Sequence, residues 1–429
     1  MLRLTLTYLS FTSLASILPF FLLPILTRVL TSEQYGQIAM FQLLMSLIGC
    51  FIGLSLNTFS EVRYTSDKKK DYLNLQFNAL LIYILSSLLL LFILLMTENY
   101  IIALFKIEVT YVYWAYLGAF LFFPVIYLLG QLQIRQLAKK YGWLQLFLAL
   151  FGATFSLLFV VLLPFGVLGR ITAIVLSYFI CFSIAIFILW EQVLKPNLAS
   201  LSIDFNEWRL AFKFGVPLIP HLLGGVLIAS GERIITVNLL GTDAVALTVV
   251  SLQFVSVITI IGQSMNQAYI PWLYGKLNKL DSLNKESIGR LILYSIFVII
   301  ALILPIYFIV PKIFILVIGE DFHSGAELVF LLCMACLIQL LYLLFVNFLF
   351  FKKKTMQITF ISLLSGVLHF IFVYFFVSNM GVIGVPISFI CVRTIQLVVT
   401  VFLVIKSYPF VFPSLISAAN SIIRKTNEV

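Results

Sequence analysis

The stretch LQFNALLIYILSSLLLLFILLM, residues Leu75–Met96, holds 22 residues without one charged side chain. An apolar run of about 20 residues, coiled into an α-helix, matches the hydrocarbon thickness of a bilayer. The run Lys68–Lys70 lies just before it. Because cations resist transfer across a membrane, this pattern predicts a spanning helix with one end fixed on the basic side.

The same pattern recurs along the chain and predicts an all-α polytopic membrane protein with about twelve transmembrane helices. The predicted spans are Leu4–Leu26, Gly36–Asn57, Leu75–Met96, Tyr111–Arg135, Trp143–Leu163, Leu168–Trp190, Phe212–Asn238, Val245–Tyr269, Leu291–Val310, Ala326–Phe350, Met356–Val377 and Val382–Lys406.

Basic residues follow alternate loops between these spans. The tails and even-numbered loops carry 21 of the 27 Lys and Arg residues: Arg3, Arg63, Lys68, Lys69, Lys70, Arg135, Lys139, Lys140, Lys195, Arg209, Lys213, Lys276, Lys279, Lys285, Arg290, Lys352, Lys353, Lys354, Lys406, Arg424 and Lys425. The opposite side holds only Arg28, Lys106, Arg170 and Lys312. The basic side is the cytoplasmic side by the positive-inside rule, so both termini are predicted to be cytoplasmic.

The composition excludes an ordinary soluble domain, since 62% of residues are hydrophobic and 10% are charged. The pI near 9.3 is explained by basic loops beside anionic lipid headgroups, so no nucleic-acid partner is predicted. Cys333 and Cys336 lie in an apolar span without acidic or histidine neighbours, which predicts neither a metal site nor a cofactor. The short outer loops leave no room for a catalytic domain.

Two pairs of motifs recur at nearly one offset. The junction Val29–Gly36 aligns with Leu239–Ala246 at 210 residues, and Gly166–Gly169 aligns with Gly381–Gly384 at 215 residues. Six spans in each half give both halves the same orientation. We therefore predict two parallel six-helix bundles, residues 1–205 and 206–429. The expected binding site is the cleft between these two repeats.

Span seven is the richest in polar residues, and a charge at mid-bilayer is costly. His221 and Glu232 share a helical face because eleven residues make about three turns. Adjacent residues of a helix point about 100° apart around its axis. Arg233 and its neighbour Glu232 are therefore expected to find different partners. The alternatives are a cavity-lining cation beside a protonatable acid, or an ion pair that only locks helices together.

Other spans offer weaker candidates. Arg135 follows Tyr127 and Gln131 in a stripe at four-residue spacing, at the basic side of span four, and is either a phosphate ligand or a topology residue. Gln263, Asn266 and Gln267 in span eight suit sugar hydroxyls or interhelical hydrogen bonds. Arg393 lies near the middle of span twelve and is a candidate to line a cavity.

The first span carries Pro19-x4-Pro24-Ile25-Leu26-Thr27-Arg28-Val29-Leu30, then Glu33 and Tyr35-Gly36. Span seven carries Val216-Pro217-Leu218-Ile219-Pro220-His221, followed by Gly231-Glu232-Arg233-Ile234-Ile235. These motifs resemble those of the Wzx-type O-antigen and polysaccharide flippases, in the multidrug/oligosaccharidyl-lipid/polysaccharide exporter superfamily. Glu232 stands where that family usually has Asp.

The resemblance implies a MATE-like bundle in the bacterial cytoplasmic (inner) membrane. Its implied substrate is an undecaprenyl-diphosphate-linked oligosaccharide, moved from the cytoplasmic to the periplasmic leaflet by ion-coupled alternating access. In this scheme Arg233, Arg135 and Arg393 neutralise the diphosphate, and Gln263, Asn266 and Gln267 contact sugars. Glu232, with His221, exchanges a proton or cation. Membrane lipid, a polysaccharide polymerase and a chain-length regulator are the implied partners, and no enzymatic activity is implied.

Two alternatives remain. One is a cation-coupled multidrug antiporter of the same superfamily. Such an antiporter needs acidic and aromatic cavities for cationic substrates, whereas the spans here hold more arginine than acid. A membrane polysaccharide polymerase needs a substantial periplasmic loop with catalytic residues, which the predicted spans do not leave.

Overall fold

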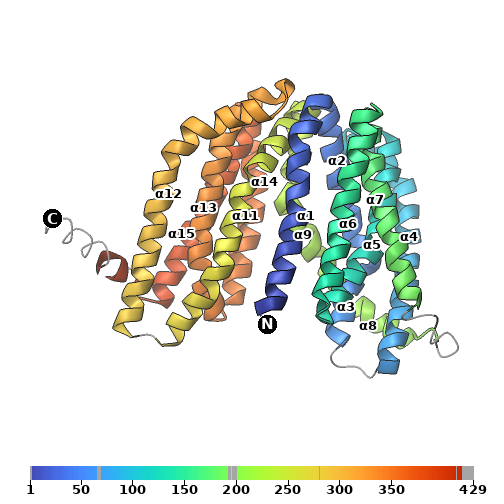
Figure 1. The fold of residues 1–429 in the computed structure, drawn as a ribbon, viewed down its shortest axis with the longest axis horizontal. Helices are drawn as coiled ribbons and strands as arrows, with labels where there is room; N and C mark the ends of the chain where they lie inside the picture. Colours follow the sequence, from blue (N-terminus) through green and yellow to red (C-terminus); the bar gives the residue numbers. More distant parts are fainter. Residues whose placement is uncertain are drawn as a thin grey trace. The chain divides into compact units, whose positions relative to one another are not determined.

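The structure, a computed structural model, describes residues 2–64, 69–191, 195, 201–279, 281–411 and 413–417. These residues form helices and their connections, without a β-strand in the part described. The α-helices are α1 (Leu2–Val29), α2 (Ser32–Phe51), α3 (Leu56–Tyr64), α4 (Lys69–Phe105), α5 (Val109–Ile134), α6 (Ala138–Ser156), α7 (Gly166–Leu189), α8 (Phe205–Gly215), α9 (Ile219–Ser230), α10 (Glu232–Leu240), α11 (Thr242–Asn278), α12 (Ser282–Val317), α13 (Ala326–Phe351), α14 (Thr355–Met380) and α15 (Gly384–Ser407). Figure 1 shows their course.

The predicted polytopic architecture is confirmed. Among the described residues, 11 segments are long and apolar enough to cross a membrane. The last of these, Met356–Ser407, holds two predicted spans because α14 and α15 are joined only by a 3-10 turn at Gly381–Ile383. Gly381 has a φ of 65°, a conformation that glycine adopts without steric cost and that lets the chain reverse there.

The described residues divide into two compact units, unit 1 (residues 1–246) and unit 2 (residues 247–429). Within unit 1, α8 packs on α3 and α4, α9 packs on α2, and α10 packs on α4. Within unit 2, α13 packs on α12 and α15, and α15 also packs on α14. Helices α8, α9 and α10, which follow residue 205, therefore pack on earlier helices of unit 1.

Span seven is not one straight helix. A 3-10 turn at Val216–Leu218 separates α8 from α9, and a turn at Gly231 separates α9 from α10. Pro217 and Pro220 lack backbone N–H donors and crowd the preceding turn, which interrupts an α-helix. The predicted helix Phe212–Asn238 was wrong in this respect, because the two prolines divide it.

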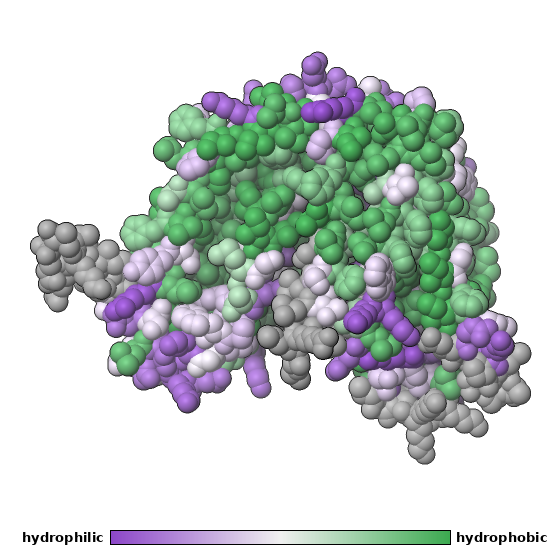
Figure 2. Space-filling model, in the orientation of Figure 1, coloured by the Kyte–Doolittle hydropathy of each residue, from purple (hydrophilic) through white to green (hydrophobic). Residues whose placement is uncertain are grey.

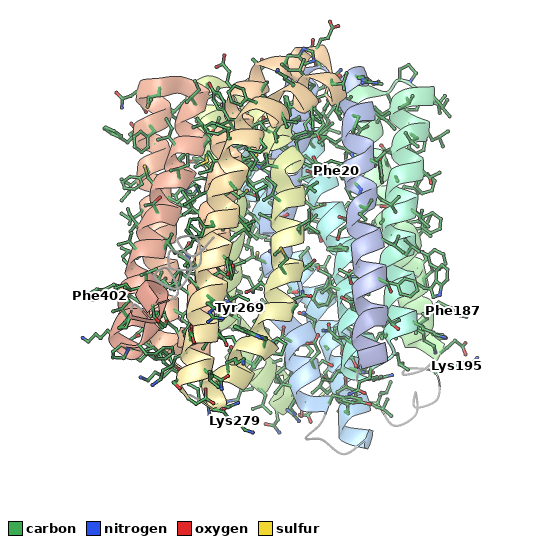
Figure 3. All side chains as sticks on the ribbon, turned by 60° about the vertical axis from the view of Figure 1, so that its left-hand side comes forward. Phe20, Phe187, Lys195, Tyr269, Lys279 and Phe402 are labelled. Carbon is green, nitrogen blue, oxygen red and sulfur yellow. The ribbon has the colours of Figure 1, made fainter. Side chains whose placement is uncertain are left out.

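Apolar side chains cover the outward faces of the helices. In Figure 2 hydrophobic residues occupy the middle of each unit, and hydrophilic residues gather near the helix ends. Phe187 in unit 1 and Phe402 in unit 2 project outward, with 65% and 64% of their surface exposed (Figure 3). Lys195 and Lys279 lie beyond helix ends in the same view. A surface of this kind fits hydrocarbon around the helices and headgroups at their ends.

The two ends of unit 1 differ in charge. We call the end where α3 finishes and α6 begins the basic end, since Arg63, Lys139 and Lys140 lie there. The far end is where α1 passes to α2 and where α7 begins. The predicted basic residues Lys68, Arg424 and Lys425 lie outside the described residues. That the basic end is cytoplasmic stays a prediction.

Candidate functional site: a cationic cavity in unit 1

Unit 1 contains a cavity of about 600 Å³ that is partly open to its surroundings. Ligand pockets in proteins usually measure about 300–1,000 Å³, so the space suits a substantial headgroup. Its lining comes from α1, α2, α5, α6, α7, α9 and α10, and its charged members are Arg170 and Arg233. The uncharged polar members are Thr12, Ser16, Gln42, Ser46, Gln145, Ser177, Tyr178 and Ser230.

Arg233 reaches this cavity from the start of α10. Its Nη1 donates a hydrogen bond to the carbonyl oxygen of Ala39 in α2, at 3.2 Å. Its side chain is 16% exposed, so the guanidinium is largely removed from solvent yet still borders the cavity. The structure thus places Arg233 in a cavity lining, and its predicted role toward a substrate stays a prediction.

Glu232 lies beside Arg233 but is wholly buried. The nearest approach, from Arg233 Nε to a Glu232 carboxylate oxygen, is 3.9 Å. This separation is too long for a hydrogen bond. Neither carboxylate oxygen has a hydrogen-bond partner among the described residues. As expected for different partners, Arg233 donates its hydrogen bond to α2 and not to Glu232, although the two charged groups lie within ion-pair distance.

Arg170 lines the cavity but was not among the predicted site residues. It was counted with the basic residues of the outer side, at the start of span six, and the structure places it near the start of α7. It donates a hydrogen bond to Ser156, a buried residue where α6 passes into a π-helical turn at Leu157–Leu162. Such turns are rare and frequently occur at functional sites. The available signal was the position of Arg170 directly after the Gly166–Gly169 motif that opens the span.

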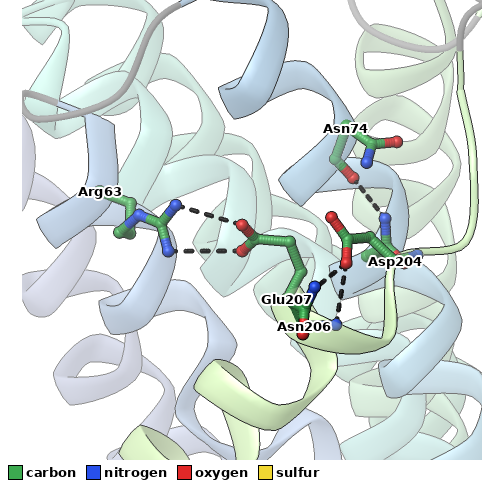
Figure 4. A network of polar contacts seen from close by, with 6 residues as sticks. Arg63, Asn74, Asp204, Asn206 and Glu207 are labelled. Carbon is green, nitrogen blue, oxygen red and sulfur yellow. Dashed lines mark hydrogen bonds and ion pairs between the residues drawn. The ribbon is translucent and has the colours of Figure 1, made fainter.

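Arg135 is not part of the cavity lining. It follows the last residue of α5 at the basic end, where its guanidinium lies 5.6 Å from the centre of the Tyr64 ring. Nearby, Arg63 forms a double contact with Glu207 of α8, at 3.2 and 3.4 Å (Figure 4). The structure thus brings Arg135 close to the residues that join α3, α5 and α8.

Two asparagines of α4 fix the chain that leads into α8. Asn74 accepts a hydrogen bond from the backbone N–H of Ser202, at 3.0 Å (Figure 4). Asn78 accepts from the backbone N–H of Asp204, at 3.0 Å, and from the indole of Trp208, at 2.8 Å. Asp204 also caps α8. The start of α8 is therefore held to unit 1 by hydrogen bonds from both side chains and backbone.

A buried polar network lies between α3, α4 and α5. Ser60 accepts from Tyr127 and from the Gln131 amide, each at 2.9 Å, and contacts the Tyr72 hydroxyl at 3.1 Å. The Gln131 carbonyl oxygen accepts from Tyr72 and from Gln76. Because Tyr72 gives its only proton to Gln131, Ser60 is the donor in the Ser60–Tyr72 contact. The stripe of Tyr127 and Gln131 was visible in the sequence, but its partners were not.

The remaining predicted residues lie apart from this cavity lining. His221 is exposed on α9, whereas Glu232 is buried. In unit 2, Gln263 and Gln267 are exposed on α11, and Asn266 accepts a hydrogen bond from Asn347 at 2.7 Å. Arg393 donates to the carbonyl oxygen of Ala335 at 3.1 Å and lies 5.4 Å from the centre of the Phe389 ring. Their predicted roles stay predictions.

The fold matches solved membrane proteins over nearly its full length. A multidrug resistance MATE family transporter, solved in an inward-facing conformation, has a TM-score of 0.71 at 14% identity, covering 92% of this chain and 94% of that one. The lipid II flippase MurJ, in an inward closed conformation, also has a TM-score of 0.71, at 12% identity, covering 99% of this chain and 93% of that one. The class is thus a multi-pass membrane protein with the fold of MATE transporters and the MurJ flippase.

The family is shown by sequence. Residues 1–275 match the family described as polysaccharide biosynthesis protein, and this chain belongs to it. A protein of the Lsg locus of Haemophilus influenzae is 27% identical over 370 residues, covering 83% of this chain and 86% of the relative. The MATE-like fold and the resemblance to polysaccharide flippases predicted from the sequence are confirmed.

Proposed function

We propose that this protein is a flippase for undecaprenyl-diphosphate-linked oligosaccharides, moving them from the cytoplasmic to the periplasmic leaflet of the bacterial inner membrane. The observation that carries the proposal is the cavity of unit 1, in which Arg170 and Arg233 are the charged lining residues. A diphosphate and several sugars are too polar to cross hydrocarbon unaided. Membership of the polysaccharide biosynthesis family and the fold shared with a lipid II flippase support a lipid-linked glycan.

The cavity offers what a diphosphate headgroup requires. Guanidinium groups donate several N–H bonds in a planar fork that matches phosphate oxygens. The hydroxyl and amide groups of the lining can replace water around sugars, while the polyprenyl tail stays in lipid. A multidrug antiporter for organic cations would instead place acids in the lining, and the lining residues include none.

We further propose that Glu232 couples transport to an ion gradient. It is buried beside Arg233, and its carboxylate oxygens lack hydrogen-bond partners among the described residues. Uptake of a proton or a cation there would change the net charge next to the arginine. In this scheme the two six-helix bundles, residues 1–205 and 206–429, alternate their access to the two leaflets, with both termini in the cytoplasm.

The test is reconstitution of the purified protein into lipid vesicles with a fluorescent polyprenyl-diphosphate-linked oligosaccharide. Arg233→Ala and Arg170→Ala are expected to reduce flipping by at least tenfold, because each removes a phosphate contact. Arg209→Ala is the matched control, since Arg209 is exposed on α8. Arg233→Lys should stay nearly as defective as Arg233→Ala if bidentate contact matters. Transport of organic cations without any lipid-linked glycan would contradict the proposal.

A further inference from the structure

The charged and the neutral polar groups of the cavity lie at different levels along its length. Gln145 lies in the second turn of α6 from the basic end, and Ser156, the partner of Arg170, is the last residue of α6. Eleven residues of α-helix separate the levels of Gln145 and Ser156 by about 16 Å. One phosphate group therefore cannot contact both ends of the cavity.

The end nearer Gln145 has neutral hydrogen-bonding groups. Thr12 of α1 donates a hydrogen bond to the Gln145 carbonyl oxygen at 3.1 Å, and the Gln145 amide donates to the Tyr141 hydroxyl at 3.1 Å. Ser16, one turn beyond Thr12, also lines the cavity. Neither arginine of the lining is bonded at this end: Arg170 bonds Ser156, and Arg233 bonds Ala39 of α2, a helix that begins at the far end.

Hydrogen-bonding chemistry decides which ligand suits this end. A phosphate only accepts hydrogen bonds, so the lone pairs of Thr12 and the Gln145 carbonyl would face its negative charge. A sugar hydroxyl both donates and accepts, and it can bond the Thr12 oxygen and the second amide N–H of Gln145 together. At the other end the two guanidiniums only donate, which suits phosphate.

We propose that Thr12, Ser16 and Gln145 form a sugar subsite, and that the substrate binds with its diphosphate toward the far end and its neutral glycan toward the basic end. This inference rests on the proposed function and adds the orientation of the headgroup. If the basic end is cytoplasmic, the glycan lies nearer the cytoplasm than the diphosphate in this conformation.

The test compares two probes on the full-length protein in lipid nanodiscs: a polyprenyl diphosphate without sugar, and the same lipid carrying a neutral oligosaccharide. Thr12→Val and Gln145→Leu are expected to weaken binding of the glycan-bearing probe about three- to tenfold. Both variants should bind the sugar-free probe as wild type does. Arg170→Ala should weaken both probes alike.

Thr97→Val is the matched control, since Thr97 bonds only its own helix on α4, away from the cavity lining. Its affinities for both probes should equal those of wild type. Equal losses on both probes in Gln145→Leu, or no loss on the glycan-bearing probe, would overturn the sugar subsite while leaving a flippase intact. A wild-type protein that binds neither probe would instead overturn the proposed function.

Discussion

The Ser32 hydroxyl donates a hydrogen bond to the carboxylate of Asp243, across 211 positions of sequence. These residues lie in the two junctions, Val29–Gly36 and Leu239–Ala246, that the internal repeat aligns. Gly36 of the first junction packs on the backbone carbonyl of Thr242 in the second. Each junction thus contacts its own counterpart at the far end of unit 1.

Loss of the Ser32–Asp243 hydrogen bond is expected to open the far end. Ser32→Ala and Asp243→Asn each remove or weaken the bond without adding bulk. A cysteine placed at Ser177, in the cavity lining, should then react faster with a membrane-impermeant thiol reagent added on the far side. Unchanged labelling in both variants would show that other contacts close this end.

Gly36 is expected to tolerate no side chain. An added Cβ would run into the Thr242 carbonyl, whereas a Cβ on Gly49, in the same helix, would meet nothing within 4 Å. Gly36→Ala should lower the free energy of unfolding by about 1–3 kcal/mol through overpacking. Gly49→Ala should be neutral or stabilising by up to about 1 kcal/mol, because alanine favours helix. Unfolding in detergent by a denaturant measures both, and equal behaviour of the pair would contradict the close packing.

The effects of Arg63 and Glu207 on stability and transport are expected to depend on each other. Arg63→Glu would place two acids together at the basic end and should reduce both stability and transport. Exchange of the charges, Arg63→Glu with Glu207→Arg, should recover much of the loss. Because the side chains are 22% and 16% exposed, we expect a coupling of about 1 kcal/mol in a double-mutant cycle. A purely additive double mutant would argue against a functional pair.

The buried network around Ser60 is expected to be sensitive to Gln131. Gln131→Leu would leave Ser60, Tyr72 and Gln76 without their shared partner and should destabilise the fold by about 1–3 kcal/mol. Gln133→Leu, two residues along the same helix but exposed, is the control and should be near neutral. Thermal unfolding of both variants in detergent measures the difference. Similar midpoints would mean that the network contributes little to stability.

The sequence by itself determined the membrane class and the spans. Apolar runs such as Leu75–Met96 are long enough to cross a bilayer and have no alternative environment in water, so hydropathy alone locates them. It also identified Arg233, because a charge in an apolar span needs a protein or watered environment. The break in span seven could be read afterwards from Pro217 and Pro220, although the span was predicted as one helix.

Only the tertiary structure decided which polar residues meet. Arg170 was counted only as a cation of the outer side, whereas the packing of α6 on α7 places it in the cavity lining beside Ser156. The pairing of Ser32 with Asp243 joins residues that no local pattern connects. The physical reason is that hydropathy depends on each side chain alone, whereas a cavity and its hydrogen bonds depend on how several helices pack, and one sequence does not show that packing.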